Sequence, residues 1–206
     1  VQTAWTTSWG ASTRLVGGLI MGHGDAGGLR LPPRIAPIQV AIVVVRDEDG
    51  AVAKARELAD AIAAAGVRVK VDADVHTGFG RRAVDWELKG VPLRIDIGPR
   101  DLAEGQVTLV RRDSGEKSQE PLEEVEHRVG DLLEDIQAAM LTEATAFRDD
   151  ATTDVSSVEE ALEAGREGVG RIEWARLGTE GERRLLDEGV SVRCIQRADG
   201  TVPASE

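Results

Sequence analysis

The sequence predicts a mixed α/β fold, and three successive segments indicate it. Residues 38–45 (IQVAIVVV) are mostly apolar and β-branched, as expected of a strand buried on both faces. Apolar residues between Val52 and Ala65 recur every three or four positions, which predicts an amphipathic helix, and Gly66 follows as its stop signal. Residues 67–72 alternate valine with polar residues, as a second strand does. A strand–helix–strand of this length predicts two parallel strands joined by a right-handed crossover.

The next segments extend this sheet. Phe79, Ala83 and Trp86 mark a further helix, and Gly90 fits the left-handed position that closes a helix. Residues 91–97 alternate apolar and polar side chains, so we expect a strand with one apolar and one polar face. Two more strands are expected, at 106–112 and, as a short edge strand, near 117–120.

The C-terminal third is helical at first and then weakly patterned. Apolar residues from Leu122 to Phe147 trace one long helix, and a polar break follows at 149–157. The rest predicts a small α+β domain with a helix at 158–165, a strand at 169–174, a helix at 180–186 and a strand at 190–195. Cys194 alternates with Val190 and Val192, so we expect a buried packing thiol. A single Cys forms neither an internal disulfide nor a four-Cys zinc site.

Residues 1–36 precede the sheet. A polar strand or turn leads into an apolar segment, with Ser12 or Thr13 as helix N-cap, and a loop rich in glycine and proline ends near Pro37. No GxGxxG follows a strand and no GK[ST] occurs, so these glycines do not predict a phosphate-binding loop. The chain lacks an initiator Met, a signal peptide and an apolar run long enough for a membrane. We therefore expect a piece of a longer, cytoplasmic protein.

The charge is distributed unevenly. The formal net charge is −12, and it divides into +2 for residues 1–36, −4 for 37–128 and −10 for 129–206. The acidity is therefore concentrated at the C-terminal end, and the middle of the chain can still carry a local basic surface. Scattered surface charge is nevertheless the more usual explanation of such Lys and Arg residues. Without Tyr and with two Phe, the chain does not predict an aromatic platform for stacking bases.

No complete catalytic set is visible. His23, His76 and His127 are scattered and lack metal-ligand spacing, so no metal site is expected. Arg14 stands at a helix start among small residues, where it either pairs with a nucleotide or forms a supporting salt bridge.

One polar cluster stands out instead. Glu87 lies at a helix end, Arg94 on a strand face and Asp101 in the turn after that strand, so their side chains are expected to project into one region. Two carboxylates and a guanidinium there can exchange hydrogen bonds with base edges. An internal ion pair between Glu87 and Arg94 is the alternative.

Two long stretches carry a resemblance to a known family. TSWGASTRLVGGLIMGHGDAGGLRLPPRIAPIQV resembles the motif 3 region of prolyl-tRNA synthetases, class II enzymes, and the entry to their anticodon-binding domain. WELKGVPLRIDIGPRDL resembles the signature of that domain in the archaeal and eukaryotic-like subgroup. The resemblance implies a proline–tRNA ligase that uses ATP with Mg, acts on tRNA(Pro) and proline, and is a homodimer when complete.

The resemblance also assigns roles and domains. Arg14 falls on the motif 3 arginine that contacts ATP, and Ser8, Trp9 and Gly10 fall on the strand that walls the proline and adenylate pocket. The residues that read the two anticodon guanines are implied to be Glu87, Arg94 and Asp101, with Lys117 as a weaker candidate. The implied domains are the end of the catalytic domain (1–36), the anticodon-binding domain (37–121), a connecting helix (122–148) and a C-terminal domain without zinc ligands (149–206).

Because motifs 1 and 2 are missing, we expect no proline activation by this chain alone. The alternative is a free-standing, non-catalytic module of the same fold that binds tRNA or a protein. A flavodoxin-like or receiver-like domain would explain the βαβ pattern, but it would not explain Arg14 or the segment GGLIMGHGD.

Overall fold

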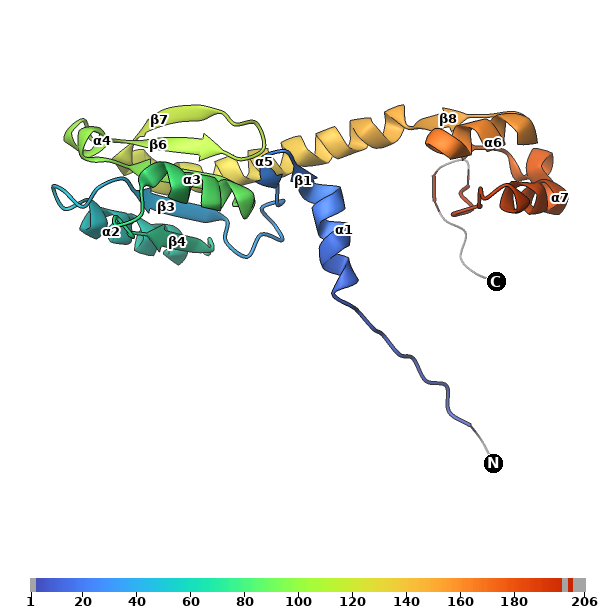
Figure 1. The fold of residues 1–206 in the computed structure, drawn as a ribbon, viewed down its shortest axis with the longest axis horizontal. Coiled ribbons are helices and arrows are strands. Elements are labelled where there is room, and N and C mark those ends of the chain that lie inside the picture. The colour runs from blue at the N-terminus through green and yellow to red at the C-terminus, as the bar shows by residue number, and fades with distance from the viewer. Residues whose placement is uncertain (1–2, 198–199, 202–206) are drawn as a thin grey trace. The chain divides into compact units, whose positions relative to one another are not determined.

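The computed structural model describes residues 3–197 and 200–201, and the chain divides into two compact units, Val1–Met140 and Leu141–Glu206. Their elements are drawn in Figure 1. The helices and strands that begin in the first unit are α1 (Arg14–His23), β1 (Gly24–Asp25), β2 (Gly28–Leu29), β3 (Val40–Val44), α2 (Ala51–Ala64), β4 (Val69–Asp72), α3 (Phe79–Leu88), β5 (Leu93–Ile97), α4 (Pro99–Ala103), β6 (Gln106–Arg111), β7 (Lys117–Pro121) and α5 (Leu122–Asp150).

The first unit is built on a five-stranded mixed sheet of order β4-β3-β5-β6-β7. Strands β4, β3 and β5 are parallel, and β6 and β7 follow as antiparallel strands. The parallel strands are joined through α2 and α3, since parallel neighbours need a crossover, whereas tight turns suffice for the antiparallel ones. The predicted mixed α/β fold is confirmed.

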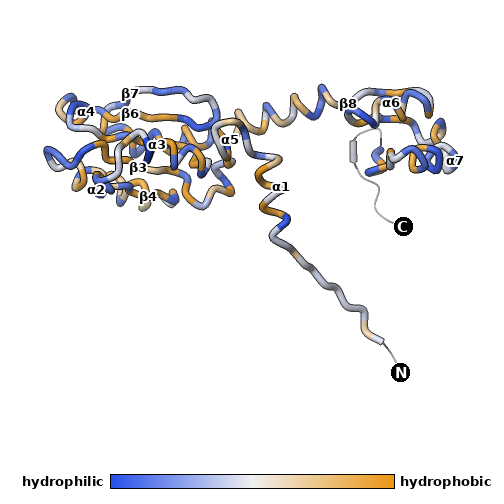
Figure 2. Tube along the Cα trace, viewed as in Figure 1, coloured by the Kyte–Doolittle hydropathy of each residue, from blue (hydrophilic) through white to orange (hydrophobic). Residues whose placement is uncertain are grey.

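Helices cover both faces of this sheet. β3 is buried on both sides, and its alternate residues belong to two different clusters. Ile42 and the residues two positions before and after it pack with α2 and α5. Ala41 and Val43, on the opposite face, pack with Trp86 of α3. Apolar residues lie along β3 and β6, whereas the edge strand β7 is hydrophilic (Figure 2).

The polar face expected for β5 is not exposed to solvent. All five residues of β5 are buried, and register pairs Arg94 with Ala41 and Asp96 with Val43. Arg94 and Asp96 therefore lie on the face that α3 covers. The alternation of residues 91–97 predicted the strand, but the helix that buries its polar side is supplied by the preceding segment of the chain.

The segment before the sheet packs against the end of α3. β1 and β2 form a short antiparallel hairpin, and β2 contacts α3. A Cβ on Gly28 would lie 2.5 Å from the Leu88 Cα, and a Cβ on Gly90 would lie 2.6 Å from the Leu29 Cβ. Both glycines also have positive φ, at 119° and 71°. Glycine at these two positions lets the two backbones approach.

N-terminal to this hairpin, α1 buries none of its residues, and Trp5, Trp9 and Met21 are almost fully exposed. Residues 3–12 form neither helix nor strand. The strand implied for Ser8, Trp9 and Gly10 is therefore absent, because these residues have no partner strand within the described chain.

The second unit is small. It comprises the end of α5 and the elements β8 (Thr152–Asp154), α6 (Val158–Glu167), β9 (Val169–Arg171) and α7 (Trp174–Asp187). β8 and β9 form a parallel pair, and Ala161, Leu177 and Leu185 are its buried apolar residues.

Three expectations for this unit were wrong. The strand expected at 190–195 is absent, and β8 lies inside the expected polar break. Val190 and Val192 do pack on the small core, but no described strand pairs with this segment. Cys194 is exposed rather than buried, because the core ends before it.

Candidate functional site

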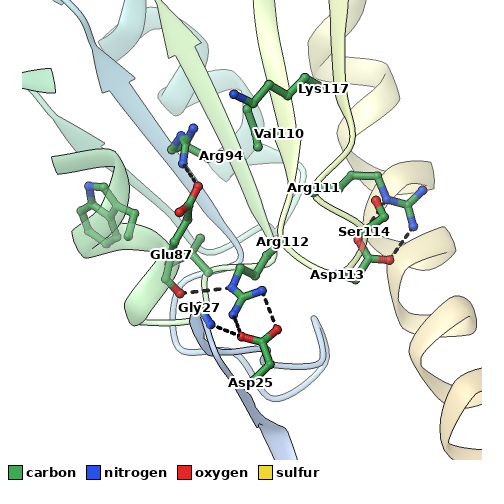
Figure 3. A pocket seen from close by; sticks show the side chains of 13 residues that line it. Asp25, Gly27, Glu87, Arg94, Val110, Arg111, Arg112, Asp113, Ser114 and Lys117 are labelled. Carbon is green, nitrogen blue, oxygen red and sulfur yellow. Dashed lines mark hydrogen bonds and ion pairs between the residues drawn. The ribbon is translucent and has the colours of Figure 1, made fainter. Parts of the chain in front are cut away.

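A pocket of about 350 Å³ opens in the first unit between the end of α3, the hairpin β1–β2 and the β6–β7 turn. Polar and charged residues outnumber apolar ones among those that line it (Figure 3). The residues that line it are Asp25, Gly27, Trp86, Glu87, Val91, Arg94, Val110, Arg111, Arg112, Asp113, Ser114, Gly115 and Lys117.

Arg94 is the central cation of this site, and its side chain is only 7% exposed. Its Nε donates to Asp96 Oδ1 at 2.9 Å and its Nη2 to Asp96 Oδ2 at 3.3 Å. Its Nη1 donates to Glu87 Oε1 at 2.9 Å and to the Ala83 carbonyl at 3.4 Å. The internal ion pair that the sequence left as an alternative is therefore present, and Arg94 holds two carboxylates at once.

The buried pair is electrostatically coupled. Burial lowers the pKa of Arg94, but the hydrogen bonds and charges of Asp96 and Glu87 outweigh it, so that the net pKa is raised and the guanidinium stays charged. Burial raises the pKa of Asp96 above its ordinary value, although Arg94 and Lys117 act in the opposite direction. No motif in the sequence singles out Asp96, although its two-residue spacing from Arg94 predicts that both lie on one strand face.

Glu87 is the exposed member of the group. Its side chain is 45% exposed, against 11% for Asp96. Its Oε1 accepts from Arg94, and the carboxylate faces the pocket (Figure 3). Glu87 thus presents a fixed carboxylate at the surface, with its charge held by a buried partner.

Lys117 and Asp101 are placed differently from each other. Lys117, the first residue of β7, lines the pocket, whereas Asp101 lies in the short helix α4 and does not line it. Both charges nevertheless act on Asp96, Lys117 lowering its pKa and Asp101 raising it. The structure thus brings Glu87, Arg94 and Lys117 to one pocket and leaves Asp101 outside it.

Two further residues at the pocket were missed by sequence analysis. Arg112 donates from Nη2 and Nη1 to Asp25 Oδ1 and Oδ2 at 2.5 and 3.0 Å, and from Nε to the Glu87 carbonyl at 3.2 Å. The hydrogen bond from Arg112, aided by the Gly27 amide, lowers the pKa of Asp25. Asp25 and Arg112 are 87 positions apart in the sequence, so no local sequence pattern predicts that they pair.

Helix α3 is anchored at its other polar positions as well. Arg82 Nη2 donates to the Val44 carbonyl at 2.7 Å, and Arg82 Nη1 donates to Asp72 Oδ1 at 3.0 Å. The Trp86 indole donates to Asp72 Oδ2 at 2.8 Å, while Lys89 lies over its ring, 4.4 Å from the centroid. The helix that carries Glu87 is thereby fixed to the ends of β3 and β4.

The side chains of this site are suited to hydrogen bonding with a polar ligand. It offers a half-exposed carboxylate as an acceptor, an ammonium group as a donor, and a buried guanidinium that orients the carboxylate. A planar polar group with donors and an acceptor on neighbouring positions would complement these side chains.

The other residues singled out in the sequence lie outside this pocket. Arg14 begins α1 and is exposed, as are Ser8, Trp9 and Gly10. The described residues contain no cluster of three or more His, Cys, Asp or Glu side chains placed to hold a metal ion. None of the described helices is both long enough and apolar enough to cross a membrane.

Comparison with known proteins places this arrangement in context. The family described as anticodon binding domain matches residues 39–132, the segment that contains the five-stranded sheet and the start of α5. A proline–tRNA ligase of Frankia casuarinae is 56% identical over 97% of the chain, and one of Streptomyces avermitilis is 46% identical over 100%. The chain covers 43% and 44% of these relatives, so it spans less than half of their length.

Solved structures give the same result. The crystal structure of prolyl-tRNA synthetase from Cryptosporidium parvum complexed with L-proline and AMP superposes with a TM-score of 0.76 at 31% identity. The match covers 86% of this chain and 39% of that one. The same enzyme complexed with halofuginone and AMPPNP gives a TM-score of 0.77.

Proposed function

Since this chain belongs to the prolyl-tRNA synthetase family, we propose that its sheet domain reads the anticodon of tRNA(Pro) for an enzyme that joins proline to that tRNA. The observation that carries the proposal is the carboxylate of Glu87, held by buried Arg94 and presented to a polar pocket. The alternative, a structural ion pair without a ligand, does not require the half-exposed carboxylate or the open pocket beside it.

The proposed contacts follow from the donors and acceptors in the pocket. A guanine that is unpaired exposes N1–H and N2–H₂, which a carboxylate accepts, and O6, to which a cation donates. Glu87 supplies the carboxylate and Lys117 the ammonium. The Arg94 guanidinium has five N–H groups, and four of them donate to described neighbours. The fifth N–H is proposed to donate to a base. Asp101 lies outside the pocket, and its proposed part in reading the second guanine rests on the family resemblance alone.

The remaining roles are proposed for the whole enzyme. Arg14 would contact ATP, which is bound with Mg, and Ser8, Trp9 and Gly10 would wall the proline and adenylate pocket. Their exposure is consistent with a surface that other parts of the enzyme cover. We further propose a cytoplasmic homodimer for the complete protein, and no proline activation by the present chain alone.

Binding to a tRNA(Pro) transcript, compared with one whose two anticodon guanines are replaced, tests this function by fluorescence anisotropy at two salt concentrations. Glu87→Gln keeps the shape of the side chain and removes its charge. We expect it to weaken binding of the native transcript by about 1–3 kcal/mol, roughly 5- to 150-fold, and to narrow the difference between the transcripts.

Asp85→Asn is the matched control, because Asp85 is exposed on the same helix, does not line the pocket and loses the same charge. We expect it to leave the difference between the transcripts unchanged. Equal binding of both transcripts by the unaltered chain, fading with salt, would show phosphate attraction alone and refute anticodon reading.

A further inference from the structure

Arg112 joins three segments of the chain at the rim of the pocket. Its backbone N–H donates to the Pro92 carbonyl just before β5, and its guanidinium donates to Asp25 in β1 and to the Glu87 carbonyl at the end of α3. The side chain is 12% exposed. Figure 3 shows Glu87 between Arg94, which holds its side chain, and Arg112, which holds its carbonyl.

Backbone contacts also hold the β1–β2 hairpin, which carries Asp25, against the end of α3. Gly28 lies against Leu88, Gly90 lies against Leu29, and the Leu31 N–H donates to the Gly90 carbonyl at 3.2 Å. The hydrogen bond from Arg112 lowers the pKa of Asp25, and the bond between the two opposite charges is charge-assisted.

The hairpin is continuous with the helix that carries Arg14. α1 ends at His23 and β1 begins at the next residue, Gly24, and the Arg30 N–H donates back to the His23 carbonyl at 2.6 Å. One guanidinium thus connects the residue proposed to read a base with the segment that leads directly to α1.

We propose that Asp25 and Arg112 form a positioning clamp that sets Glu87 for base reading and ties the anticodon pocket to α1. This proposal rests on the proposed function. In it, Asp25 and Arg112 position Glu87 and do not themselves need to contact the base. Glu87 is held through both its side chain and its carbonyl, and the carbonyl accepts from the Gly90 N–H at 2.9 Å as well as from Arg112. Losing the Arg112 bond therefore loosens the helix end and lets the carboxylate leave the orientation that Arg94 gives it.

The test compares Arg112→Gln and Asp25→Asn with Arg111→Gln. Arg111 is the matched control, since it is the preceding residue, lines the same pocket and pairs with Asp113 at 2.7 Å, but none of its described contacts reaches Glu87. The measured quantity is the ratio of affinities for the native and the guanine-replaced transcript. We expect Arg112→Gln and Asp25→Asn to lower this ratio about tenfold. Arg111→Gln should lower the affinity for both transcripts by the same factor, because it removes a positive charge, and so leave the ratio unchanged.

Hydrogen exchange of residues 14–31 supplies a second readout. We expect binding of the native transcript to slow exchange there in the unaltered chain and not in Asp25→Asn. Should Arg112→Gln fail to fold, Asp25→Asn carries the test, because it keeps the size of the side chain and weakens the charge-assisted bonds that hold the Arg112 guanidinium against the Glu87 carbonyl.

The outcomes separate the clamp from the function on which it rests. An unchanged affinity ratio in the folded variants, with guanine discrimination intact in the unaltered chain, would overturn the clamp and leave anticodon reading standing. No discrimination in the unaltered chain would instead overturn anticodon reading itself. A merely structural role would lower the free energy of unfolding without moving the ratio.

Discussion

Arg94 and Asp96 are two charges on a strand whose other residues pack among apolar side chains. Their mutual hydrogen bonds offset the free energy of removing both from water, and each depends on the other for that balance. Removing one partner leaves a buried charge without compensation, whereas removing both leaves an apolar site that neighbouring side chains can fill. The pair is therefore expected to be strongly non-additive.

Arg94→Met should lower the free energy of unfolding by about 3–5 kcal/mol, because Asp96 is left buried and unpaired. The double variant Arg94→Met, Asp96→Leu should recover most of this loss. Urea unfolding followed by circular dichroism measures both. If the double variant is as unstable as the single one, packing rather than charge compensation holds this part of the sheet.

The same residue limits how binding data can be read. Loss of RNA binding in an Arg94 variant follows both from a lost base contact and from a released Glu87, since Arg94 holds that carboxylate at 2.9 Å. Glu87→Gln separates these causes, as Arg94 keeps its bidentate partner Asp96.

At the scale of elements, the contact between the hairpin and α3 depends on glycine for two separate reasons. Gly90 and Gly105 both have positive φ, at 71° and 67°. A Cβ on Gly90 would also meet Leu29, 2.7 Å from its carbonyl oxygen, while a Cβ on Gly105 would meet nothing within 4 Å. The two positions therefore separate backbone strain from collision between elements.

Gly105→Ala should cost about 1–2 kcal/mol of unfolding free energy from its left-handed backbone alone. Gly90→Ala should cost about 1–3 kcal/mol more, because the hairpin must shift. Hydrogen exchange should show the Arg30 and Leu31 amides exchanging faster in Gly90→Ala and unchanged in Gly105→Ala. Equal unfolding free energies in the two variants would contradict a tight hairpin contact.

The sequence predicts an element well when residues close together in the chain are enough to specify it. The β-branched run at 38–45 and the period of α2 are local, and both elements are found close to their expected positions. The alternation at 190–195 is equally clear, but a strand also needs a partner, and alternation contains no information about one. The burial of Arg94 and Asp96 and the pairing of Asp25 with Arg112 arise from contacts between distant segments, for the same reason.

At the scale of the whole molecule, the two compact units differ in how much apolar surface they bury. The main cluster of the first unit includes the large, fully buried side chains Ile42, Ile62, Leu93, Ile95, Ile97, Leu109 and Ile136. The second unit buries Ala161, Leu177 and Leu185 among its described residues. Hydrophobic stabilisation grows with buried apolar area, so a core this small is marginal by itself.

The chain is therefore expected to unfold in urea in two steps, with residues 141–206 losing protection at the lower concentration. Leu185→Ala should shift only the first step and Leu109→Ala only the second, each by about 2–5 kcal/mol, the range for a buried leucine. Pulsed hydrogen exchange with mass analysis of peptides from each unit resolves the steps. One transition shared by both units, shifted alike by either variant, would mean that they fold cooperatively. In that case the small core is stabilised by the first unit, and variants in either unit must be checked for stability before their RNA binding is interpreted.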